Sequence, residues 1–96
     1  MSDAIELSPI LDIVAAPGLL ESIMQHRGRQ LVLEAGHVQR LGAQCLQILL
    51  AARKAWAEDG VSLQYANSSE GFLTSLELLG VSISRLTYTA KRESGE

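Results

Sequence analysis

The stretches QLVLE (residues 30–34) and GAQCLQILLAARKAWAED (residues 42–59) decide the fold of this 96-residue chain. The first is a short apolar run between Gly28 and Gly36, which predicts a central strand covered on both faces. The second has apolar residues at helical spacing and stops at Gly60, a residue type common just after a helix end. A strand followed by a long amphipathic helix predicts an α/β domain.

Two strands and a helix are predicted before this pair. Residues 4–7 and 10–14 are short apolar runs on either side of Pro9, and we expect both to be strands. Pro17 then suits the first turn of a helix that ends near Gly28, since proline has no N–H to lose there. The order up to residue 34 is therefore strand, strand, helix, strand.

The second half of the chain continues the alternation. Residues 61–65 (VSLQY) predict a strand, and Ser69 is a good cap for a helix that runs to Gly80. Its expected apolar stripe is Phe72, Leu73, Leu76 and Leu79. Residues 81–87 could add a last strand.

Composition limits the function classes. The net charge is −3 and the eight Lys and Arg residues are scattered, so nothing predicts nucleic-acid binding. The chain has one cysteine, Cys45, which favours a reducing compartment. It begins with an acidic segment rather than a basic one, and no apolar run approaches the roughly 20 residues that span a bilayer. We therefore expect a cytoplasmic protein without membrane insertion.

The long helix has an uncharged start. We expect one line of side chains to face the sheet: Cys45, Leu46, Leu49, Leu50, Ala52 and Trp56. The opposite side carries Gln44, Gln47, Ile48, Ala51, Lys54, Ala55 and Glu58. Residues 42–52 contain no charge, whereas a solvated helix face usually has several. Either a neighbouring helix covers this side, or a partner protein docks on it.

The order and spacing of these segments resemble the STAS family. The run LVLE (31–34), VQRL (38–41) and GAQCL (42–46) is similar to that family's buried strand ending in an acid, its hydrophobic turn and its DSSG-like motif at the start of the long helix. The segments ILDIVAAPGLLESI (10–23) and FLTSLELLGV (72–81) resemble other elements of the family.

The resemblance covers residues 5–81. It implies a mixed sheet of four or five strands with three helices packed mainly on one face. It also implies a single domain over residues 1–90, followed by a charged, disordered tail over 91–96.

One departure from the family bears on function. STAS regulators of the anti-sigma-factor-antagonist kind carry a phosphorylatable Ser or Thr just after the Asp of the motif. Here the Asp position is Gly42 and the acceptor position is Ala43, and no Ser, Thr or Tyr lies between Ile23 and Val61. Because neither residue has a hydroxyl, phosphorylation at this site is chemically excluded. The family's switch is therefore absent.

Two kinds of bacterial STAS protein with degenerate motifs suggest partners. The chain resembles more closely the STAS accessory proteins of chemotaxis clusters, which bind a histidine kinase. The alternative is the small STAS subunit of a phospholipid-transport ABC system, which binds the ATPase. A sensor for a nucleotide or lipid, and a weak homodimer, are further alternatives. The resemblance implies a partner contact at the start of the long helix, formed by Arg40, Gly42, Ala43, Gln44, Gln47, Ile48 and Ala51.

The sequence offers little for catalysis or for a cofactor. Cys45 and His37 are a formal nucleophile and base, but Cys45 falls on the core-facing line of the helix. The histidines and Glu34 do not match the spacing of a zinc site. Asp12 is expected to cap the first helix. We therefore predict a signalling protein that binds another protein, with no enzymatic activity, metal or cofactor.

Overall fold

The structure, a computed structural model, describes residues 3–90 and has an α/β architecture. The predicted tail at 91–96 lies outside the described residues. In chain order the elements are β1 (Asp3–Glu6), β2 (Ile10–Leu11), α1 (Ala16–Met24), β3 (Leu31–Glu34), β4 (Arg40–Leu41), α2 (Ala43–Asp59), β5 (Leu63–Ala66), α3 (Glu70–Leu78) and the 3-10 helix η1 (Ile83–Leu86). Five strands and three α-helices confirm the predicted fold class. None of the helices in residues 3–90 is both long and apolar enough to cross a membrane.

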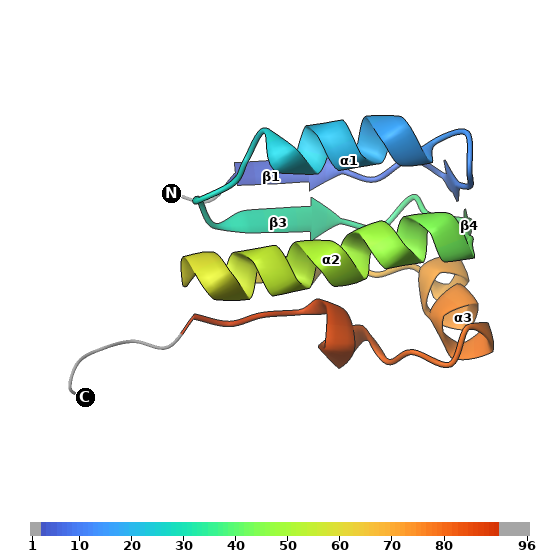
Figure 1. The fold of residues 1–96 in the computed structure, drawn as a ribbon. Coiled ribbons are helices and arrows are strands. Elements are labelled where there is room, and N and C mark those ends of the chain that lie inside the picture. The colour runs from blue at the N-terminus through green and yellow to red at the C-terminus, as the bar shows by residue number, and fades with distance from the viewer. Residues whose placement is uncertain (1–2, 91–96) are drawn as a thin grey trace.

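The strands are divided between two parallel groups. The strand order β1-β3-β5 forms a three-stranded sheet, and β2 pairs with β4 beyond it. A single antiparallel bridge joins Leu63 of β5 to Tyr88. Figure 1 shows α1 and α2 lying side by side along the sheet, whereas α3 lies at the end where β4 is found. The start of α2, β2, β4 and α3 therefore meet at one end of the molecule.

The three-stranded sheet is covered on one face only. Leu31 and Leu33 of β3 are fully buried, but Val32 and Glu34, which point the other way, are half-buried. The expectation that β3 is covered on both faces is therefore wrong. The neighbours of these two residues on that face include Glu6 and Gln64, whose polar side chains suit water rather than a covering helix.

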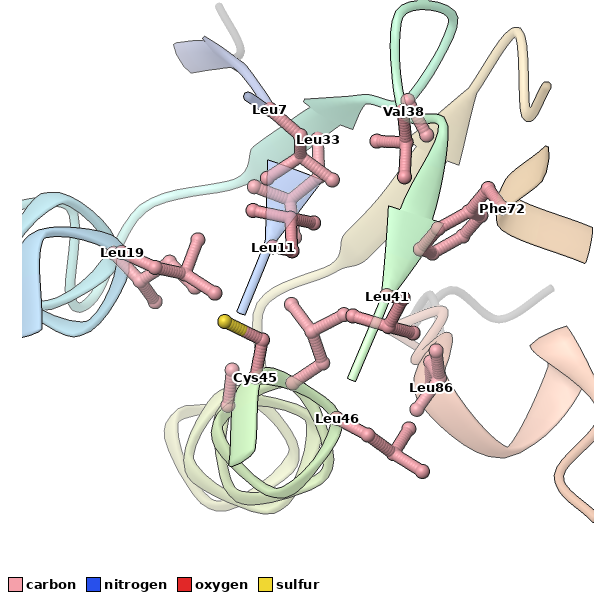
Figure 2. Packing of buried hydrophobic residues seen from close by; sticks show 14 of the residues in the cluster. Leu7, Leu11, Leu19, Leu33, Val38, Leu41, Cys45, Leu46, Phe72 and Leu86 are labelled. Atoms are coloured by element: carbon pink, nitrogen blue, oxygen red, sulfur yellow. The ribbon is translucent and has the colours of Figure 1, made fainter. Parts of the chain in front are cut away.

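The core confirms the predicted inner line of α2 except at Leu50, which is half-buried and lines a hollow at the surface. Cys45, Leu49 and Trp56 are completely buried, and Figure 2 shows Cys45 directed toward Leu11 and Leu19. The indole Nε1 of Trp56 donates a hydrogen bond to the carbonyl oxygen of Arg29 at 2.7 Å, so its polar atom is satisfied inside the core. Each large apolar side chain buried in this way contributes about 1.5–3 kcal/mol.

The predicted strand over 10–14 ends early. Only Ile10 and Leu11 form β2. The Oδ1 atom of Asp12 accepts hydrogen bonds from the backbone N–H groups of Val14 and Ala15, at 3.1 and 3.0 Å. This local bonding competes with strand pairing and turns the chain into α1. Asp12 therefore forms the turn before α1, but the prediction that it caps the helix is wrong: the N-cap residue is Ala15, and no side chain caps this end of α1.

The predicted last strand over 81–87 is also wrong. Ile83–Leu86 forms the 3-10 helix η1, in which the Arg85 N–H donates to the Ser82 carbonyl at 3.0 Å. The turn carries Leu86 into the core, where it is fully buried. In an extended strand, successive side chains point to opposite faces, and here only one side of the segment faces the apolar core.

The start of α3 agrees with the sequence. The Oγ atom of Ser69 accepts from the Phe72 N–H at 3.0 Å and donates to the Val38 carbonyl. Phe72 and Leu76 are buried as expected, but Leu73 and Leu79 are 44% and 38% exposed. The buried stripe of α3 is therefore narrower than predicted.

Candidate functional site

The first turn of α2 is open and uncharged. Gly42 is the N-cap, with extended backbone angles (φ −97°, ψ 174°) and no side chain to cap the helix. Its N–H donates to the Leu11 carbonyl at 2.9 Å, which fixes the helix start against β2. A Cβ atom at Gly42 would meet only the Leu11 carbonyl oxygen, at 3.6 Å. The fold would therefore accept a side chain at this position. The absence of the motif's Asp here has no steric cause.

The predicted contact residues lie together at this start of α2. Five of them have exposed side chains: Arg40, Ala43, Gln44, Gln47 and Ala51. Gly42 and Ile48 are half-buried, and Ile48 packs against the core. We call the seven residues the α2 surface. Its exposed part is made of alanine and glutamine side chains, with the single charge of Arg40 at its edge.

Two apolar residues beside this surface were not predicted as part of it. Ile13 and Val14 are 65% and 83% exposed. They belong to the turn that Asp12 forms, and this turn lies against α2 because the Cys45 thiol donates to the Asp12 carbonyl at 3.3 Å. The sequence signal for them was the Asp12 turn, which ends the strand and leaves the next two side chains without a sheet to face.

A second apolar group lies at the end of α3. Leu78 is 82% exposed and Leu79 is 38% exposed. Together with Ile10 and Arg40 they line a hollow of about 580 Å³ that reaches Gly42. The Leu41 N–H donates to the Ser75 hydroxyl at 3.0 Å, which holds α3 against β4. The α2 surface is thus flanked by exposed apolar side chains on both sides.

The two residues considered for catalysis, Cys45 and His37, have different surroundings. The Cys45 thiol is buried, and burial raises its pKa, with the charge of Asp12 adding to the effect. The Nε2 atom of His37 lies 2.8 Å from Glu6, at an exposed position. A thiol with a raised pKa is a poor nucleophile because the thiolate is the reactive form.

The residues considered for a metal site are each paired with other residues of the chain. His26 Nδ1 lies 2.7 Å from Asp3 Oδ2, and Glu34 accepts hydrogen bonds from Asn67 and from the Gly36 N–H. Within residues 3–90 no group of three or more His, Cys, Asp or Glu side chains could hold a metal ion.

Comparison with known proteins identifies the family. The family model described as "Mlab, STAS domain" matches residues 2–88. No curated protein and no solved structure gives a significant match. STAS domains are typically protein-interaction modules and are generally non-catalytic. Because the match spans nearly the whole chain, the chain belongs to the STAS domain family.

Proposed function

We propose that this protein is a non-enzymatic module that docks on an ATPase-domain protein through the α2 surface, with no phosphorylation switch of its own. The observation that carries the proposal is the grouping of exposed apolar residues around an uncharged helix start. Ile13 and Val14 lie on one side of it, and Leu78 and Leu79 lie on the other. Apolar patches of this kind on small domains mark binding sites for other proteins.

The missing acceptor defines the regulation we propose. A phosphate at residue 43 would add about two negative charges to the α2 surface and oppose an apolar contact. Ala43 cannot carry one. Control of the complex would therefore act on the partner or on the amount of this protein.

A histidine kinase, of a chemotaxis or another signalling pathway, is the first partner candidate. It rests on the uncharged helix start, which resembles that of the chemotaxis STAS proteins. The second candidate is the ATPase of a phospholipid-transport ABC system. The description of the matching family names Mlab and does not refer to chemotaxis, which favours this second candidate.

The α2 surface is tested by introducing charge. Ala43→Glu is expected to abolish capture of the partner in a pull-down. An acid in the first turn of a helix is stabilising by about 0.3–1 kcal/mol, so this variant should fold normally. Ala4→Glu places the same charge at an exposed position on β1, outside the surface, and should bind as the wild type does. If Ala43→Glu captures the partner as well as Ala4→Glu does, the proposed surface is wrong.

The two partner candidates are separated with purified proteins. The ATP-binding domain of a histidine kinase and the ATPase subunit of a phospholipid-transport system, both from the source genome, are immobilised in parallel. Retention on one and not on the other assigns the partner. Gene neighbours give an independent answer, because kinase and response-regulator genes accompany the first candidate, and permease genes accompany the second.

A further inference from the structure

A group of three cations surrounds a second hollow beside α2. Arg53 and Lys54 of α2 and Arg85 of η1 line a space of about 480 Å³, together with Leu50 and Ser84. The two cationic residues of α2 lie about ten residues beyond its start, which is roughly 15 Å along the helix axis. We call this the basic hollow. It is separate from the Leu78–Leu79 hollow at the end of the molecule.

The charge of the basic hollow is not neutralised within the described part of the chain. Elsewhere, Arg27 pairs with Asp59 at 2.8 Å and Arg29 pairs with Asp3 at 3.0 Å. Among residues 3–90, by contrast, no carboxylate oxygen lies within 4 Å of the cationic groups of the basic hollow. This is notable in a chain whose net charge is −3.

Arg53 is held in place for an outside acceptor. Its Nε atom donates to the Thr87 carbonyl at 3.2 Å, and its guanidinium carbon lies 5.7 Å from the centre of the Tyr88 ring. These contacts hold the planar group in one orientation, and the two Nη nitrogens make no hydrogen bond within the described residues. A guanidinium fixed in this way binds a carboxylate in a two-pronged manner at low entropic cost.

The basic hollow continues the α2 surface. Ala51 and Lys54 are both exposed and lie one turn apart, and Leu50 lines the hollow. A protein seated on the α2 surface would therefore extend over the cations. We propose that the basic hollow receives an acidic segment of the partner protein, whose carboxylates pair with Arg53, Lys54 and Arg85. This inference rests on the proposed function and adds the chemistry of the partner.

An acidic segment fits the hollow better than a small free anion. The cationic groups come from two separate elements around an open space of about 480 Å³, far larger than one phosphate. The lining also includes the apolar side chain of Leu50. A segment that alternates acidic and apolar side chains would satisfy both features. A lone phosphate would leave the apolar side chain of Leu50 uncovered.

The first experiment uses a defined probe in place of the partner. Binding of a fluorescein-labelled hexaglutamate peptide to the full chain is measured by fluorescence polarisation, with hexaglutamine as the neutral control. Lys54→Gln and Arg85→Gln are each expected to weaken hexaglutamate binding by up to about fivefold, the range that exposed ion pairs give. Both residues are exposed, so the variants should fold. Arg29→Gln removes an exposed cation outside both the hollow and the α2 surface, and it should have little effect on hexaglutamate binding.

Three outcomes would overturn the inference. The first is equal binding of hexaglutamine, and the second is an equal loss of hexaglutamate binding with Arg29→Gln. The third is displacement of the peptide by inorganic phosphate at a concentration where chloride has no effect, which would show a site for a free anion. The peptide assay does not involve the partner, so its failure is distinct from a failure of Ala43→Glu.

The second experiment connects the hollow to the complex. The double variant Lys54→Glu/Arg85→Glu should lose partner capture, and the capture of wild-type protein should weaken as salt is raised. Ala43→Glu should lose the partner but keep hexaglutamate binding. If the double charge reversal captures the partner normally, the basic hollow is not part of the interface, whereas the α2 surface would still stand on its own test.

Discussion

The Sγ atom of Cys45 donates a hydrogen bond to the carbonyl oxygen of Asp12, across 3.3 Å. This contact joins the first turn of α2 to the turn that exposes Ile13 and Val14. Two segments 33 residues apart in the sequence thereby form one surface. Because of this hydrogen bond, residues from both segments contribute to the candidate partner-binding site.

The buried position of Cys45 makes its thiol unreactive in the folded protein. Burial raises the pKa of the thiol, so little thiolate is present near neutral pH. Alkylation by iodoacetamide at pH 8 should be slow in buffer and rapid in concentrated urea, as followed by mass spectrometry. Equal rates in the two conditions would show that the thiol is accessible in the native state.

Truncation of Leu76 should lower stability, whereas truncation of Leu78 should weaken partner binding. Leu76 is 2% exposed and Leu78 is 82% exposed. Leu76→Ala is expected to lower the free energy of unfolding by about 2–5 kcal/mol. Leu78→Ala should change it by less than about 0.5 kcal/mol but weaken partner capture. Urea denaturation measures the first effect and a pull-down the second; normal capture by Leu78→Ala would remove the end of α3 from the interface.

Gly71 and Gly18 form a matched pair of helical glycines. A Cβ atom at Gly71 would lie 2.5 Å from the Gln39 carbonyl oxygen, whereas nothing lies within 4 Å of a Cβ atom at Gly18. Gly71→Ala should therefore cost about 1–3 kcal/mol through displacement of backbone. Gly18→Ala should stabilise α1 by about 0.5–1 kcal/mol. Thermal unfolding of both variants tests the packing of α3 on the segment before β4, and an unaffected Gly71→Ala would contradict that packing.

Removal of the Tyr65 hydroxyl should stabilise the protein. The hydroxyl is buried with no hydrogen-bond partner among the described residues, and burial raises its pKa above the usual range. The ring stacks on Phe72 with centroids 5.8 Å apart, and Tyr65→Phe would keep that contact. We expect a gain of about 1 kcal/mol in the free energy of unfolding, measured in urea. A loss of stability would mean that the hydroxyl is satisfied in solution.

Asp3 should make stability depend on pH in the acid range. The hydrogen bond with His26, with the charge of Arg29 adding to it, lowers the pKa of Asp3 below its ordinary value of 3.8. The stabilisation is present above pH 3.8 and is lost as the pH falls through the lower pKa of the folded state. Asp3→Asn should therefore be less stable than the wild type at pH 6, and the difference should vanish in strong acid. Urea titrations at several pH values, with the exposed Glu21→Gln as control, measure it.

Local patterns predicted the longer elements well. Helix α2 was expected over 42–59 and is found at Ala43–Asp59, because its apolar spacing and Gly60 specify both the face and the end. Ser69 specified the start of α3 in the same way. The short strands were harder to predict from the sequence. The two-residue β4 was not predicted, since its pairing with β2 depends on a contact between segments 30 residues apart.

The sequence by itself determined the inner line of α2, the burial of Cys45 and the loss of the phosphoacceptor at Ala43. These properties follow from side-chain chemistry and from the helical period. Only the tertiary structure decided which residues surround the start of α2. Val14 lies beside it in the turn before α1, Leu78 lies near it at the end of α3, and Arg85 of η1 lies beside the cations of α2. No local pattern encodes such juxtapositions, because chain crossovers and packing between distant segments set them.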